Sequence, residues 1–235
     1  MYKCFLKRLL DIFLCGIAVI VLSPLYLLTA IAIKFSSPGP VFYYSERTGK
    51  NHRPFKFYKF RSMHVTNADK GLFVADADRV FTVGKIIRRL KIDELPQLIN
   101  VLEGDMSIVG PRPMPFASVD RTYYGKYQNI LSITPGLTSA ASLFDYVVGD
   151  TYKDDKAYRK EVLPIKLEME LMYVERQSFI YDAELVWRTI KTIVQVMFGK
   201  QDFEDQTELA EAKRRIQKYC EVNGQNNAER ILGRE

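Results

Sequence analysis

The sequence predicts a mainly α-helical protein with a small β-hairpin (α+β), preceded by an apolar N-terminal segment. Three observations predict this class: a long uncharged apolar run, two short β-prone segments around a turn, and apolar residues at helical spacing in several later segments. We expect three regions: a membrane hairpin over residues 1–35, a compact domain over 36–200, and a polar C-terminal helix or tail over 201–235.

Composition narrows the classes of partner. Hydrophobic residues make up 47% of the 235-residue chain, so a packed core is expected, and the formal net charge of +6 favours anionic partners. Membrane phospholipid and phosphorylated small molecules fit this charge. Nucleic acid is not expected as a partner, because no RRM, zinc-finger or helix-turn-helix signature is present. The three cysteines are too widely spaced for a disulfide framework or a zinc site.

The apolar run from Ile12 to Ile33 is long enough to cross a membrane. As a straight helix at ~1.5 Å per residue it measures roughly 33 Å, about the thickness of the hydrocarbon core. Pro24 lacks an N–H and clashes with the carbonyl four residues back, so it predicts a kink near Ile20, and the Ser23 hydroxyl can satisfy a freed backbone group. We therefore expect a helix-break-helix whose halves, each roughly 16 Å long, are too short to span a bilayer.

Positive charge flanks the apolar run on both sides. Three basic residues precede it, namely Lys3, Lys7 and Arg8. Many more follow it, from Lys34 onward. Because Lys and Arg mark the cytoplasmic side of a membrane, the flanks favour a re-entrant hairpin that leaves both of them in the cytoplasm. A simple spanning helix remains the alternative. A secretory signal peptide is not expected, because the apolar run is too long for one.

A short β-hairpin is expected after the apolar run. Val41–Tyr44 and Phe55–Phe60 are β-prone, and Gly49 and Asn51 lie between them. Lysines give the second strand at least one basic edge. This edge is either a solvated surface or a cationic wall, including Lys59, that faces a phosphate.

The stretch "GKIIRRLKIDELPQLINVLEGDMSIVGPRP" predicts two helices and a turn. A short basic helix of the kind found at lipid interfaces would place four residues on one apolar face: Ile86, Ile87, Leu90 and Ile92. We expect Asp93 to be the N-cap of the second helix, which has Pro96 in its first turn and ends at Gly104. The segment "SIVGPRP" is expected to be a rigid turn that fixes Arg112 between two prolines.

Two further helices are expected over Glu161–Gln177 and Ala183–Phe198. The second is either an amphipathic interfacial helix or an ordinary core helix. Residues 201–235 are polar and charged, which predicts a surface helix or a loosely held tail.

Asp93 and Glu94 are the strongest candidates for chemistry. They follow Arg88, Arg89 and Lys91 at the start of a helix, where nearby cations and the helix dipole favour the ionised form. An ionised carboxylate can act as a nucleophile toward phosphorus or as a ligand for Mg²⁺. A salt-bridged capping pair remains the alternative. Histidine catalysis is not expected, because neither of the two histidines has an evident triad partner.

Two long stretches resemble one known family. The runs "KRLLDIFLCGIAVIVLSPLYLLTAIAIKFSSPGPVFYYSERTGKNHRPFKFYKFRSM" and "TVGKIIRRLKIDELPQLINVLEGDMSIVGPRP", roughly residues 5 to 113, closely resemble the bacterial sugar transferase family. These are the monotopic polyprenyl-phosphate phosphoglycosyl transferases. Weaker similarity extends to about residue 195. The chain looks like the small form of the family, since no further membrane domain precedes Lys7.

The resemblance implies a fold, a reaction and a location. The family's N-terminal helix is re-entrant and broken at a Ser-Pro pair, here Ser23 and Pro24, and interfacial amphipathic helices and a compact cytoplasmic catalytic domain follow. The family transfers a sugar-1-phosphate from a nucleotide diphosphate sugar, usually a UDP-sugar, to a polyprenyl phosphate. It acts at the bacterial inner (cytoplasmic) membrane, as the first membrane step of a glycoconjugate or polysaccharide pathway. UMP is the usual product, and Mg²⁺ is required.

The resemblance also implies roles for individual residues. Asp93 and Glu94 match the catalytic Asp-Glu dyad and are the expected metal ligands. Asp93 would attack the sugar-linked phosphorus to form an aspartyl phosphosugar, and Glu94 would bind the metal or assist the second step. Arg88, with Lys59 and Arg112, is expected to contact phosphates, because forked or compact cations suit phosphoryl oxygens.

After residue 113 the chain departs from the family's pattern. Ser139 and Ser142 stand where Gly and Gln are common, the arginine that usually follows is missing, and Glu170 stands where Asp is common. The sugar, the polyprenol length and the oligomeric state, a homo-oligomer included, therefore stay open. A catalytically silent membrane-surface scaffold of the same fold is the alternative function.

Overall fold

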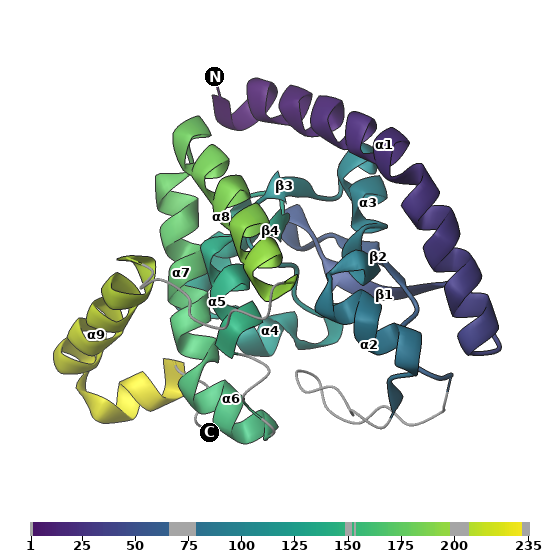
Figure 1. The fold of residues 1–235 in the computed structure, drawn as a ribbon. Helices are drawn as coiled ribbons and strands as arrows, with labels where there is room; N and C mark the ends of the chain where they lie inside the picture. Colours follow the sequence, from purple (N-terminus) through teal and green to yellow (C-terminus); the bar gives the residue numbers. More distant parts are fainter. Residues whose placement is uncertain (1, 66–78, 149–151, 153, 198–206, 232–235) are drawn as a thin grey trace.

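The computed structural model describes residues 2–65, 79–148, 152, 154–197 and 207–231. Helices dominate it, and strands β1 (Phe42–Thr48) and β2 (Pro54–Phe60) form an antiparallel hairpin, so the predicted mainly α fold with a small hairpin is confirmed (Figure 1). Short elements complete the chain: η1 (Tyr2–Leu6), η2 (Lys50–His52), η5 (Phe116–Ser118), α4 (Val119–Thr122), η6 (Gly125–Ser132) and α6 (Asp155–Glu161).

A second pair of strands, which the sequence did not predict, lies beside the hairpin. Strands β3 (Ser107–Val109) and β4 (Gly136–Thr138) run parallel to each other. They approach so closely that a Cβ atom on Gly136 would lie 2.0 Å from the backbone nitrogen of Gly110, so only glycine fits there.

Helix α1 (Lys7–Ser36) runs without interruption through Ser23 and Pro24. The Ser23 hydroxyl donates to the Ile20 carbonyl oxygen at 2.8 Å, which is the acceptor that Pro24, lacking an N–H, leaves without its helical partner. Figure 1 shows that α1 bends near its middle. The prediction that the helix is interrupted here is therefore wrong. The Ser23 hydroxyl replaces the hydrogen bond that Pro24 cannot make, so the helix bends and continues.

Both halves of α1 pack against the same body of the protein. Before the bend, Arg8 Nη2 donates to the Leu102 carbonyl oxygen at 2.9 Å. After the bend, the Tyr26 hydroxyl donates to the Leu95 carbonyl oxygen at 2.5 Å, and Ile33 is fully buried. The helix therefore wraps around the segment that contains both acceptors.

The outer surface of α1 is apolar and uncovered. By length and composition the helix is able to cross a membrane, and only 11% of its most apolar window is buried. Large exposed side chains lie on both sides of the bend: Ile20, Val21, Leu27 and Leu28. An exposed apolar surface of this extent is typical of a face that meets lipid or a partner.

The helix that follows the hairpin differs from its prediction. Helix α2 (Thr82–Arg89) ends before Lys91, which adopts the left-handed conformation with φ 57° and separates α2 from the next turn. Ile87 is buried, whereas Ile86 is 54% exposed. The predicted common apolar face over residues 86–92 is therefore wrong, because its members do not lie on one helix.

Asp93 is not an N-cap, so that prediction is also wrong. It lies in the 3₁₀ turn η4 (Ile92–Glu94), and α3 (Gln97–Glu103) begins after Pro96 without a side-chain cap. Pro96 has no N–H to bond the Ile92 carbonyl, so the regular helix starts only beyond it. Gly104 ends α3 in the left-handed conformation, with φ 98°, as predicted.

Three helices enclose the main core: α5 (Ala140–Val148), α7 (Leu163–Arg176) and α8 (Phe179–Met197). The predicted helices over 161–177 and 183–198 correspond to α7 and α8, although Phe198 lies outside the described residues. Helix α8 also carries exposed apolar side chains: Phe179, Ile180, Trp187, Ile190 and Val194. This uncovered face favours the interfacial alternative for α8 over the core alternative.

The polar C-terminus forms helix α9 (Thr207–Ile231), which packs on α7. Arg215 Nη1 lies 2.8 Å from Glu175 Oε2 across this contact. The surface-helix alternative is therefore favoured for this segment. Residues 201–206 and 232–235 of the predicted tail lie outside the described residues.

Candidate active site

Asp93 and Glu94 project from the short turn η4, between α2 and α3. Lys91 starts this turn in a conformation that residues with a Cβ atom rarely adopt. The carbonyl of Leu95 accepts the hydrogen bond from Tyr26, two residues after Pro24 in α1. The arm of α1 that follows the Ser23–Pro24 bend therefore reaches the turn that carries the two carboxylates.

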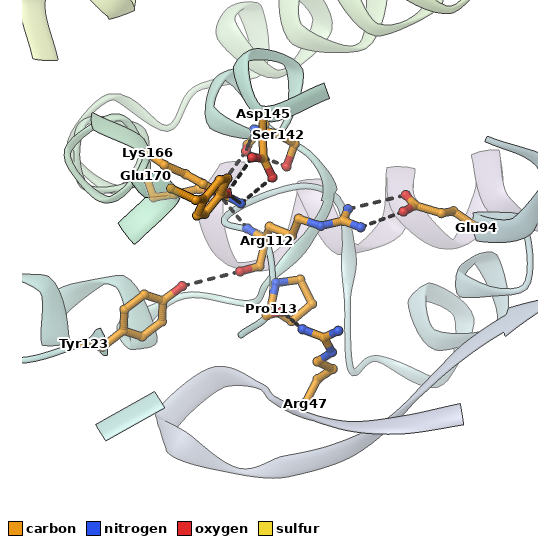
Figure 2. Close-up of polar contacts among 11 residues, drawn as sticks. Arg47, Glu94, Arg112, Pro113, Tyr123, Ser142, Asp145, Lys166 and Glu170 are labelled. Carbon is orange, nitrogen blue, oxygen red and sulfur yellow. Dashed lines mark hydrogen bonds and ion pairs between the residues drawn. The ribbon is translucent and has the colours of Figure 1, made fainter. Parts of the chain in front are cut away.

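Glu94 is held by two of the three cations that the sequence singled out. Arg112 binds it with both arms of its guanidinium, with Nη2 2.6 Å from Oε1 and Nη1 3.4 Å from Oε2 (Figure 2). Lys59 Nζ donates to Oε1 at 3.0 Å. Burial alone would raise the pKa of Glu94, but Arg112 and Lys59 outweigh it and hold the pKa well below its ordinary value. Glu94 is therefore ionised, as predicted.

Asp93 has a different environment from its neighbour. It is 6% exposed, Lys59 Nζ lies 3.9 Å from Oδ2, and Oδ1 is buried without a hydrogen-bond partner. Burial raises the pKa of Asp93, and Lys59 opposes that rise only in part. Lys91, one of the cations expected to keep the pair ionised, lowers the pKa of Glu94 less than Arg112 and Lys59 do. At Asp93, burial outweighs both Lys91 and Arg88, so the expectation that these neighbouring cations dominate is wrong there. A buried carboxylate oxygen without a partner is what a nucleophile or an ion ligand presents.

Arg88 stands further from the carboxylates than Lys59 and Arg112 do. It lies on α2, and its charge lowers the pKa of Asp93. In the described part of the chain it forms no ion pair with either carboxylate. The structure thus brings Lys59 and Arg112, but not Arg88, into direct contact with the pair among the described residues.

Tertiary contacts fix the backbone that carries Arg112. Its N–H donates to Glu170 Oε1 at 3.0 Å, and its carbonyl oxygen accepts from the Tyr123 hydroxyl at 3.4 Å (Figure 2). Arg112 follows β3 after Gly110 and Pro111. The predicted rigid turn over residues 107–113 is therefore wrong for residues 107–109, which form β3, and a buried carboxylate and a strand pair hold Arg112 in addition to the prolines.

Three positions that depart from the family pattern meet beside Arg112. The Ser139 hydroxyl donates to Glu170 Oε1 at 3.1 Å and accepts the Ser142 N–H at 3.0 Å, which caps the start of α5. The serines and the glutamate therefore act together as a support for the site.

Glu170 predicts a dependence of stability on pH. Burial raises its pKa from 4.5 to about 7. The folded protein then binds this proton more tightly than the unfolded chain, so stability falls as the pH rises from about 4.5 to about 7. From pH 5 to pH 8, the free energy of unfolding of wild type should therefore fall by roughly 2 to 3 kcal/mol more than that of Glu170→Gln. Thermal denaturation in detergent at both pH values measures this, with Glu175→Gln, an exposed position on the same helix, as the control. Equal losses for wild type and Glu170→Gln would contradict it.

A further group of side chains, which the sequence did not single out, lies beyond Arg112. Asp145 Oδ2 lies 2.6 Å from Lys166 Nζ, and Asp145 Oδ1 accepts from the Tyr158 hydroxyl at 2.5 Å. Figure 2 shows this group on the side of Arg112 opposite Glu94. The sequence did not indicate a role for Lys166, because the helical period of α7 does not predict that a buried lysine contacts a half-buried carboxylate.

The donor set fits Mg²⁺ in part. The described residues contain no group of three or more His, Cys, Asp or Glu side chains that could hold a metal. Mg²⁺, however, is commonly bound by one or two carboxylates, with water and substrate phosphates as its other ligands. Asp93 Oδ1 fits as such a ligand, because it is buried without a partner. Both Glu94 oxygens already accept from cations, so Glu94 fits less well.

Comparisons with known proteins identify the family of the chain. A model of the bacterial sugar transferase family matches residues 2–196. UDP-N-acetylgalactosamine-undecaprenyl-phosphate N-acetylgalactosaminephosphotransferase of Aeromonas hydrophila is 42% identical over 197 residues, which cover 81% of this chain and 44% of the relative. UDP-glucose:undecaprenyl-phosphate glucose-1-phosphate transferase of Escherichia coli K12 is 38% identical over 189 residues, which cover 79% and 39%. Exopolysaccharide production protein PSS of Rhizobium leguminosarum bv. phaseoli is 36% identical over 197 residues, which cover 79% and 93%. The chain thus spans less than half the length of the first two relatives.

Proposed function

Because the chain belongs to the bacterial sugar transferase family, we propose that it transfers a sugar-1-phosphate from a UDP-sugar to a polyprenyl phosphate. The two substrates are those in the names of the first two relatives, which differ in the sugar. One observation carries the proposal: Asp93 offers a carboxylate oxygen without a partner beside a cluster of cations. That arrangement suits attack on a phosphorus atom that carries negative oxygens.

The reaction proceeds in two displacements at the same phosphorus. A carboxylate oxygen of Asp93 attacks the sugar-linked phosphorus, the bond to the nucleotide phosphate breaks, and UMP leaves with the bonding electron pair. An aspartyl phosphosugar remains. A phosphate oxygen of the polyprenyl phosphate then attacks this phosphorus, the bond to Asp93 breaks, and the carboxylate is regenerated.

The neighbouring residues bind and orient the phosphates. Glu94 holds Lys59 and Arg112 in fixed positions, so their charges point toward the place where the diphosphate must lie. Arg88 contributes a further cation on the α2 side. Asp93, assisted by Glu94 if its cation contacts rearrange, would hold Mg²⁺, which when bound stabilises negative charge on the leaving phosphate.

The bent helix α1 is the part of the protein that would bind the site to a membrane. Its two halves pack on one body, its outer surface is apolar, and basic residues flank it on both sides. These features support a re-entrant, monotopic insertion at the cytoplasmic face of the bacterial inner membrane, with the apolar face of α8 against phospholipid. A soluble UDP-sugar and a membrane-bound phosphate can meet there, as the first membrane step of a glycoconjugate or polysaccharide pathway.

Release of UMP tests the proposed function. Wild-type protein in membranes should release UMP from at least one UDP-sugar, and a labelled sugar phosphate should appear on undecaprenyl phosphate. The alternative, a membrane-surface scaffold, would be favoured by wild-type protein that remains membrane-bound and folded but releases no UMP from any UDP-sugar supplied.

Pro24→Ala is expected to straighten α1. Alanine restores an N–H that can bond the Ile20 carbonyl, so the bend loses its cause and the longer rod favours a spanning form. A cysteine introduced at Lys3, in a variant without the native cysteines, should become less accessible from the cytoplasm to an impermeant maleimide. Pro38→Ala, at an exposed proline outside the helix, is the control. Unchanged labelling in Pro24→Ala would remove this account of the bend.

A further inference from the structure

Arg47 lies on the face of the hairpin that is turned toward the candidate active site. The strand register pairs Arg47 with Phe55, Ser45 with Phe57, and Tyr43 with Lys59. Residues that are paired across two strands, and every second residue along them, lie on one face of the sheet. Arg47 therefore shares its face with Lys59, the cation that binds Glu94.

The same aromatic ring supports both cations. Arg47 Cζ lies 5.3 Å from the centroid of the Phe57 ring, and Lys59 Nζ lies 5.5 Å from that centroid. Figure 2 shows the Arg47 guanidinium beside Pro113, the residue after Arg112. Arg47 thus lies next to the cluster formed by Lys59, Arg112 and Glu94.

Arg47 has no anionic partner in the described part of the chain. Its two hydrogen bonds are long and reach neutral acceptors, with Nε 3.4 Å from Ser45 Oγ and Nη1 3.4 Å from the Pro113 carbonyl oxygen. Burial, together with the like charge of Arg112, lowers the pKa of Arg47 to about 10, and Glu94 only partly offsets them. A partly buried guanidinium beside another guanidinium is unfavourable unless an anion joins them.

The charges of the site show which anion is missing. Glu94 already binds Arg112 and Lys59, and Asp93 lies beside Lys59, so neither carboxylate is left for Arg47. A diphosphate would supply the missing negative charge, and a guanidinium fork matches phosphoryl oxygens.

We propose that Arg47 binds the nucleotide-side phosphate of the donor and holds it as the leaving group. This inference rests on the proposed function. Asp93 must contact the sugar-linked phosphorus, whereas Arg47 lies beside Arg112 and Pro113 and not beside Asp93. Arg47 therefore binds the other phosphate, the one that becomes part of UMP. It is then a phosphate-binding residue on a different element from Lys59, Arg88 and Arg112.

Direct binding of UMP and UDP to detergent-solubilised full-length protein tests the assignment, with and without Mg²⁺. Arg47→Gln should weaken UMP binding about 10- to 100-fold, the value of a lost charged hydrogen-bonding contact. In the transfer assay kcat/KM for the UDP-sugar should fall by a similar factor, with KM for the polyprenyl phosphate unchanged. Arg53→Gln, an exposed arginine of the same hairpin, is the matched control and should bind UMP as wild type does.

Each result decides for or against Arg47. Unchanged UMP binding in Arg47→Gln, or a raised KM for the polyprenyl phosphate alone, would overturn the proposal. Arg47→Lys keeps the charge but loses the fork, and it should weaken UMP binding several-fold even if the glutamine variant fails to fold. Unchanged binding in Arg47→Lys would also overturn it. UMP binding that depends on Arg47 in a wild-type protein without transfer activity would support this contact while removing the proposed reaction.

Discussion

Asp93→Asn is expected to abolish sugar-phosphate transfer while the fold survives. The substitution removes the proposed nucleophile, and loss of such a group typically costs about 10⁴-fold or more in rate. Asn has the same shape as Asp. Within the described residues Asp93 Oδ1 has no hydrogen-bond partner that the amide would lose, and Lys59 lies 3.9 Å from Oδ2. Stability should therefore change little.

Two measurements check this prediction. UMP release gives the rate, and mass spectrometry after incubation with a UDP-sugar, without acceptor, locates the phosphosugar adduct. We expect the adduct on Asp93 in wild type and its absence in Asp93→Asn. Asp120→Asn, a change at an exposed aspartate, is the control. An adduct on another residue, or near-normal UMP release by Asp93→Asn, would remove Asp93 as the nucleophile.

Arg112→Gln is expected to lower kcat/KM about 10²- to 10³-fold, the range seen when one preorganised charge-stabilising donor is removed. Arg112 binds both oxygens of Glu94, and a glutamine cannot reproduce that fork. The change leaves Glu94 buried with Lys59 as its remaining cation, so Glu94 and Lys59 both lose their fixed geometry. The substitution should therefore weaken phosphate binding as well as the contact between Glu94 and its cations.

A double-mutant cycle separates this pair from a general loss of stability. Once Glu94→Gln has removed the carboxylate, Arg112→Gln should cost much less than it does in wild type, because the pair acts as a unit. The same assay of UMP release serves for all four proteins, and Arg121→Gln, at an exposed arginine on α4, is the control. Additive losses in the double variant would show that the contact between Glu94 and Arg112 does not carry the effect.

Local chemistry explains what could be predicted. Ser23 and Pro24 predicted a kink near Ile20 and a hydroxyl that satisfies a freed carbonyl, and the structure contains both, because the effect of proline reaches only four residues back. Adjacent carboxylates among basic residues predicted a charged site, and Lys59 and Arg112 do bind Glu94. The β-prone segments predicted the hairpin, since a turn joins strands that are close in sequence.

Some predictions failed because a neighbouring residue changed the backbone, and others because the contact forms only in the fold. Asp93 looked like an N-cap, but Pro96 delays α3 and leaves Asp93 in a 3₁₀ turn. Residues 86–92 looked like one helical face, but the left-handed conformation of Lys91 ends the helix. Arg47 looked like one of many flanking charges, because its significance depends on the strand register and on the second guanidinium at Arg112.

By itself the sequence determined the bent apolar helix, the hairpin, and the acidic pair with its neighbouring basic residues, because each depends on residues that are close to one another in the chain. Only the tertiary structure decided that Arg112 and Lys59 hold the pKa of Glu94 low while burial raises the pKa of Asp93. It also decided that Glu170 supports Arg112 from a distant helix. The physical reason is that the ionisation and position of a buried group depend on burial and on charges from other elements, which meet only when the chain has folded.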